Sequence, residues 1–110
     1  MSEAVERAFA EVLRAEEPVE AWRARAAADP SLAALARYVT PNGLTMAAIL
    51  VLQLRYERLV RGSAEAMRED RDAPAEFARA FRRYHAEVAP TALLPPGEAQ
   101  LWAHWRERND

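Results

Sequence analysis

Cysteine and lysine are both missing from this chain of 110 residues, and glycine occurs only three times. The absence of cysteine excludes disulfide bonds, thiolate zinc sites and cysteine nucleophiles, and it is compatible with a reducing cytoplasm. Three glycines are too few for a phosphate-binding loop or a dinucleotide-binding fingerprint. All 15 basic residues are arginine, which we attribute to a GC-rich genome rather than to function.

Long hydrophobic runs and targeting signals are also missing. The longest apolar run covers residues 46–52, far short of the roughly 20 residues that span a bilayer. The N-terminus carries acidic residues where a secretory signal has positive charge. We therefore expect a cytoplasmic protein with no membrane partner.

The composition is that of a small globular domain, with 51% hydrophobic residues and a net charge of −2. A chain of this length buries enough apolar surface to fold without cross-links, so we predict a single helical domain over residues 1–110. The slight negative charge does not favour general attraction to nucleic acid or anionic lipid. Acidic and basic stretches alternate along the chain, which favours charge pairing between neighbouring helices.

Apolar side chains recur at helical spacing throughout, and proline and glycine mark the ends of the segments. No segment alternates apolar and polar residues as a strand does. We predict an all-α, compact single-domain bundle of about five to six helices around a hydrophobic central helix over residues 41–61. Residues 44–54 are apolar on nearly every side, which predicts neighbouring helices all around this part.

Four local predictions refine this outline. Gly62 should end the central helix in a left-handed conformation, because glycine adopts it freely. Residues 63–71 are either a loose helical turn or an exposed loop. The leucines of the connector at 89–96 should lie against the core. Of Trp102 and Trp105, one should lie in the core and the other at its margin.

Residues that could carry chemistry are few. The two histidines, His85 and His104, do not stand at metal-ligand spacing with each other or with Glu87, Glu98 and Glu107. No serine lies in a nucleophile elbow. We therefore expect no catalytic residues, no metal and no cofactor, and no enzyme activity from this chain alone. A small-molecule or metal site built from His85, His104 and the aromatic residues is a third, weaker alternative.

Arginine and aromatic residues supply the candidate binding surface. Arg55, Arg58 and Arg61 share one side of the central helix, and Arg79, Arg82 and Arg83 share one side of a later helix. If the two helices are neighbours, these guanidinium groups form a cationic surface suited to phosphate or carboxylate. The alternative is that they pair with the glutamates of residues 1–20. The predicted partner-binding residues are Arg55, Arg58, Arg82, Arg83 and Trp105.

A C-terminal aromatic group offers a second candidate feature, with core packing as its ordinary explanation. Its members are Phe77, Phe81, Tyr84, Trp102 and Trp105.

The stretch Thr40-Pro41-Asn42-Gly43-Leu44, followed by apolar residues 47–50, resembles the small helical subunits of type III RNA-guided complexes. In that family an Asn-Gly-Leu also precedes a hydrophobic helix. The resemblance covers about ten of the 110 residues and does not identify the chain as a member. It implies a role as an RNA-binding subunit.

The sequence thus predicts a non-catalytic helical protein-interaction module, an accessory subunit or partner of a larger protein or enzyme complex. Its partner is another protein or a second copy, as in a homodimer. The alternative is a small helical RNA- or DNA-binding subunit of a nucleoprotein complex that uses an arginine-rich surface. Salt dependence separates the two, because phosphate binding weakens steeply as salt rises.

Overall fold

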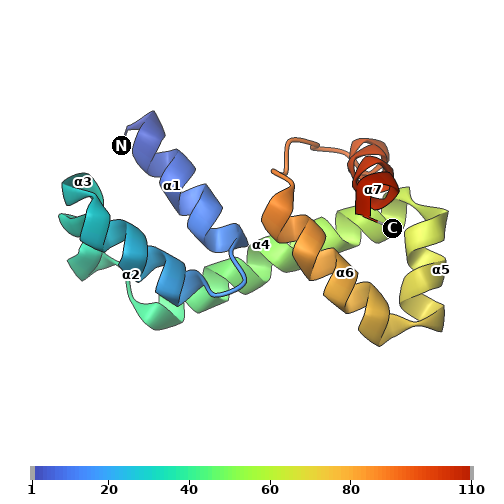
Figure 1. Cartoon of the computed structure of the whole chain (residues 1–110), viewed down its shortest axis with the longest axis horizontal. Coiled ribbons are helices and arrows are strands. Elements are labelled where there is room, and N and C mark those ends of the chain that lie inside the picture. Colours follow the sequence, from blue (N-terminus) through green and yellow to red (C-terminus); the bar gives the residue numbers. More distant parts are fainter. Residues whose placement is uncertain (1, 110) are drawn as a thin grey trace. The chain divides into compact units, whose positions relative to one another are not determined.

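The computed structural model describes residues 2–109, and every regular element in that range is helical (Figure 1). The α-helices are α1 (Glu3–Arg14), α2 (Pro18–Ala28), α3 (Pro30–Ala33), α4 (Pro41–Gly62), α5 (Ala64–Asp72), α6 (Pro74–Glu87) and α7 (Pro95–Asn109), and η1 (Ala36–Tyr38) is a 3₁₀-helix. The predicted all-α fold class is confirmed. The described part has more helices than expected because the short α3 and the charged α5 are both helical.

The chain divides into two compact units, Met1–Val51 (unit 1) and Leu52–Asp110 (unit 2). Helix α4 gives its first half to unit 1 and its second half to unit 2. Each unit has its own cluster of buried apolar side chains. That the whole chain forms one domain stays a prediction.

Unit 1 is built on the apolar side of α1. Phe9 on this helix stacks on Trp22 of α2, with ring centres 4.9 Å apart. The Ser2 hydroxyl oxygen accepts a hydrogen bond from the Val5 backbone N–H at 3.2 Å, which satisfies one of the free donors at the start of α1. Arg25 forms an ion pair with Glu11, so the expected charge pairing between helices occurs here. The buried core residues are Val5, Ala8, Val12, Trp22, Leu32 and Leu44.

Unit 2 has an aromatic core made largely by α6 and α7. Trp102 and Trp105 are both 2% exposed, so the prediction that one of them lies at the margin is wrong. Trp105 can be buried because its indole N–H donates to Glu87 Oε1 at 3.0 Å, which satisfies its only polar atom. The buried core residues are Leu59, Ala66, Phe77, Phe81, Tyr84, Trp102 and Trp105.

The role of Gly62, at the junction between α4 and α5, differs from the predicted one. No residue in the described range has a positive φ, so Gly62 is not a left-handed cap but the last residue of α4. A Cβ at this position would lie 2.1 Å from the Pro95 carbonyl oxygen. Glycine is therefore needed because the start of α7 approaches the backbone of α4 closely. Ser63 then caps α5 by accepting from the Ala66 N–H at 3.0 Å.

Helix α4 is not surrounded by other helices, which corrects the prediction for residues 44–54. Met46, Ile49, Leu50 and Leu54 are between 55% and 66% exposed. An apolar helix side favours burial, but burial also requires a neighbouring element that packs on it.

The connector leucines, Leu93 and Leu94, are 88% and 69% exposed, so the prediction that they lie against the core is wrong. No helix within residues 2–109 combines the length and apolarity needed to cross a membrane.

Candidate functional site

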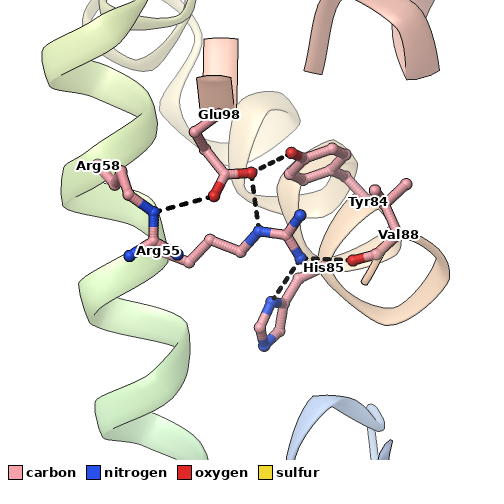
Figure 2. A network of polar contacts seen from close by, with 6 residues as sticks. All are labelled: Arg55, Arg58, Tyr84, His85, Val88 and Glu98. Atoms are coloured by element: carbon pink, nitrogen blue, oxygen red, sulfur yellow. Dashed lines mark hydrogen bonds and ion pairs between the residues drawn. The ribbon is translucent and has the colours of Figure 1, made fainter. Parts of the chain in front are cut away.

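Two features of the structure stand apart from ordinary core packing. The first is a buried polar network in unit 2 that centres on Glu98, in the first turn of α7 (Figure 2). A carboxylate at this position is favoured by the positive end of the helix dipole. The second feature is an exposed apolar side of α4. The network comprises Arg55, Arg58, Tyr84, His85, Val88 and Glu98, and we call it the Glu98 network.

Both oxygens of the Glu98 carboxylate accept hydrogen bonds from arginine. Arg55 Nε donates to Oε2 at 2.9 Å, and Arg58 Nε donates to Oε1 at 3.1 Å. The Tyr84 hydroxyl also donates to Oε2. Arg55 and Glu98 are both 0% exposed, so this ion pair is fully removed from water. These hydrogen bonds compensate the free-energy cost of burying a charged carboxylate, which is high for a carboxylate without partners.

The guanidinium group of Arg55 has further contacts. Its Nη1 donates to the Val88 carbonyl oxygen at 2.6 Å and lies 3.4 Å from His85 Nδ1. Val88 is the C-terminal cap of α6, where helix carbonyls lack partners within the helix. The Arg55 guanidinium carbon also lies 4.4 Å from the ring centre of Tyr84, in a cation–π contact. Nη2 is buried and makes no hydrogen bond within residues 2–109.

Burial raises the pKa of the Tyr84 hydroxyl, and its hydrogen bond to Glu98 raises it further. The hydroxyl therefore stays protonated and remains a donor far above neutral pH. A buried carboxylate with donors on both oxygens is placed to hold helices together rather than to exchange protons with a substrate. The Glu98 network links α4, α6 and α7, and we interpret it as structural.

The predicted partner-binding residues do not form one exposed face. Arg55 and Trp105 are buried, and the Arg58 side chain is 24% exposed, whereas Arg82 and Arg83 lie at the surface of α6. The prediction that all five share an accessible surface is therefore corrected. The physical reason is Glu98, a partner 43 positions after Arg55, which no i+3 or i+4 spacing reveals. The alternative partners, the glutamates of residues 1–20, are not the ones that pair with Arg55 and Arg58.

A sequence signal for this network exists. Glu98 lies at i−3, i−4 and i−7 from Leu101, Trp102 and Trp105, so it shares their apolar stripe. Arg55 likewise lies four positions before the buried Leu59. A charged residue at a core position of each of two helices predicts a buried ion pair, because unpaired charges are rarely fully buried.

The two histidines of the third candidate site lie in different surroundings. His85 is 3% exposed and lies in the Glu98 network, where its ring stacks on Phe81 at 6.1 Å. His104 is exposed on α7. Within the described residues, no group of three or more histidine or carboxylate side chains is placed to hold a metal ion. These observations give the proposed metal site no support.

The exposed apolar side of α4 in unit 1 consists of Met46, Ile49 and Leu50, which we call the α4 apolar face. Their spacing of i, i+3 and i+4 places them on one side of a helix. Residues 41–54 carry no charge at all. Contiguous exposed apolar side chains of this kind are typical of interaction sites.

Comparisons of the chain with protein-family models, with curated proteins and with solved structures give no match. The resemblance to small helical subunits of RNA-guided complexes thus stays limited to the short segment around residues 40–50.

Proposed function

We propose that this protein is a non-catalytic interaction module that binds another protein through the α4 apolar face, as an accessory subunit in the cytoplasm. The observation that carries the proposal is the exposure of three large apolar side chains on one side of α4 in unit 1. A face of this kind binds the apolar side of a partner helix, with anchors at i, i+3 and i+4 positions.

The free energy available from this face is moderate. Full burial of one Leu, Ile or Met side chain contributes about 1.5–3 kcal/mol, and more than half of each side chain remains to be buried here. Three such side chains supply about 3–5 kcal/mol. Association costs at least about 4 kcal/mol in lost translational and rotational freedom. The partner must therefore also contact polar residues of unit 1 beside this face, such as the exposed Thr45.

A nucleic-acid role is less well supported than protein binding. Arg55 and Arg58 are occupied by Glu98, so they do not offer free charges to phosphate. Arg83 lies 3.6 Å from Glu87 and stacks over Trp105 at 5.5 Å. The cationic surface expected from two helices is thus reduced mainly to the arginines of α6. Binding of RNA or DNA by Arg82 and Arg83 stays a prediction.

The test is an affinity capture from a lysate of the organism that encodes the protein, with and without nuclease. The wild-type chain is compared with Met46→Glu, which places a charge in the α4 apolar face. The matched control is Met67→Glu, because Met67 is also an exposed methionine on a helix, at 53% exposure against 66% for Met46. Both variants should fold normally, since exposed helix positions tolerate glutamate within about 0.5 kcal/mol.

The proposal predicts a stoichiometric protein that survives nuclease, binds the wild type and Met67→Glu, and is lost with Met46→Glu. A protein retained equally by both variants would show that the α4 apolar face is not the binding surface. A protein that is captured without nuclease but lost after nuclease treatment would instead support the nucleic-acid alternative. Absence of any partner, together with a monomeric chain, would overturn the proposal.

A further inference from the structure

We propose that Asn42 is a site of spontaneous deamidation, in which its side-chain amide becomes a carboxylate beside the α4 apolar face. Asn42 and Gly43 form the only Asn-Gly pair of the chain. Glycine has no Cβ, so its backbone nitrogen is open to close approach by the preceding side chain. The effect of the modification on binding rests on the proposed function, whereas the modification itself does not.

Asn42 lies on the same side of α4 as the α4 apolar face. Met46, Ile49 and Leu50 follow it at i+4, i+7 and i+8, which is the spacing of residues that share one side of a helix. Asn42 is exposed, whereas Leu44, on the other side of the helix, is buried in the core of unit 1. All of these residues belong to unit 1. A partner that covers Met46 therefore also lies close to the Asn42 side chain.

The reaction needs only water as a second reactant. The backbone nitrogen of Gly43 loses its proton to solvent base and attacks Cγ of Asn42. A C–N bond forms, the side-chain nitrogen leaves as ammonia, and a succinimide ring results. Water then opens the ring at either of its carbonyl groups and yields aspartate or isoaspartate. Nothing is oxidised or reduced, and each product carries a negative charge that asparagine lacks.

The first turn of α4 controls access to this reaction. The Gly43 backbone N–H donates to Thr40 Oγ1 at 3.0 Å, so the nitrogen that has to attack is held in the helix cap. The Thr40 carbonyl oxygen accepts from the Leu44 backbone N–H at 3.0 Å, which closes the turn. Deamidation therefore requires local opening of this turn, and the ends of helices open at a low free-energy cost.

Either product weakens binding at the α4 apolar face. An aspartate at position 42 stays compatible with the fold, because the first turn of a helix favours a carboxylate. It nevertheless places a charge where the partner packs, and burial of an unpaired charge is costly. In isoaspartate the main chain runs through Cβ and Cγ, so the residue no longer has the backbone of a helical residue. Deamidation is thus a slow switch that lowers partner binding as the molecule ages.

Mass spectrometry of the tryptic peptide 38–55 measures the modification after long incubation of the folded chain in mildly alkaline buffer. Thr40→Ala removes the cap acceptor, so the opened turn should become about fivefold more populated and Asn42 should deamidate about fivefold faster. Thr40→Ser keeps a hydroxyl acceptor and is the matched control, with the wild-type rate. Equal rates for the wild type and Thr40→Ala would overturn the proposal. So would a folded wild type that does not convert while the same chain in urea does.

Affinity capture measures the effect on binding. Asn42→Asp should recover at least about tenfold less of the protein partner than the wild type, whereas the uncharged control Asn42→Gln should recover as much. Full capture by Asn42→Asp, together with loss of the partner in Met46→Glu, would overturn the switch and leave the proposed function standing. Capture that both charged variants leave unchanged would overturn the switch and the proposed function together, and the deamidation rates would still test the modification by themselves.

Discussion

Replacement of Glu98 by glutamine removes one negative charge from a fully buried position and leaves the side-chain size unchanged. Arg55 is also fully buried, and Glu98 is its only carboxylate partner within the described residues, so its positive charge would be left unpaired away from water. Breaking a buried ion pair in this way costs about 3–5 kcal/mol. Arg58 adds little to this loss because its side chain, 24% exposed, can turn toward solvent.

This loss is large against a total stability of about 5–15 kcal/mol for a domain of this kind. For a chain of this length, 1 kcal/mol corresponds to about 4 °C in melting temperature, so Glu98→Gln should lower it by about 12–20 °C. Urea unfolding followed by circular dichroism and by tryptophan fluorescence measures the effect. Two of the three tryptophans, Trp102 and Trp105, belong to the core of unit 2 and report on it directly. Arg58→Met is the matched control and should cost about 1 kcal/mol.

Two results would contradict this prediction. A Glu98→Gln variant within about 1 kcal/mol of the wild type would show that the charge of Glu98 does not hold unit 2 together. The double variant Arg55→Met with Glu98→Leu is expected to recover much of the lost stability, because no unpaired charge remains. If the double variant instead loses as much stability as Arg55→Met and Glu98→Leu lose together, the effect is due to packing and not to charge.

Two further predictions concern unit 2. Gly62→Ala should destabilise the protein by about 1–3 kcal/mol, because the added Cβ meets the backbone of Pro95, whereas Gly43→Ala, whose Cβ meets only a side-chain oxygen, should cost less in the same urea titration. The hydrogen bond to Asp70 raises the pKa of Tyr56 from 10.0 to about 12, so Tyr56 stabilises the folded state below pH 10 and loses this effect as pH rises toward 12. Tyr56→Phe should therefore cost about 1 kcal/mol near neutral pH and less at high pH; a difference independent of pH would contradict this.

The helices were largely predictable because their signals are local. Asp29 and Thr40 accept hydrogen bonds from the backbone N–H groups of Ser31 and Gly43, at the helix starts that the following prolines indicate. Apolar spacing likewise identified the buried sides of α1 and α6. These features depend on residues within a few positions of one another, so a single sequence contains them.

The candidate site was not predictable in the same way because its partners are distant in sequence. Arg55 was predicted to be part of a partner-binding surface, yet Glu98 pairs with it inside unit 2. Conversely, the apolar side chains of Met46 and Leu50 predicted neighbouring helices around them, yet both are more than half exposed. The chemical type of a side chain indicates whether its burial is favourable, whereas tertiary packing decides which residues surround it.

The most direct test of the α4 apolar face is affinity capture from a nuclease-treated lysate with the wild type, Met46→Glu and Met67→Glu as baits. We expect a stoichiometric protein to bind the wild type and Met67→Glu and to be lost with Met46→Glu. A protein that all three baits retain equally would show that the α4 apolar face is not the binding surface.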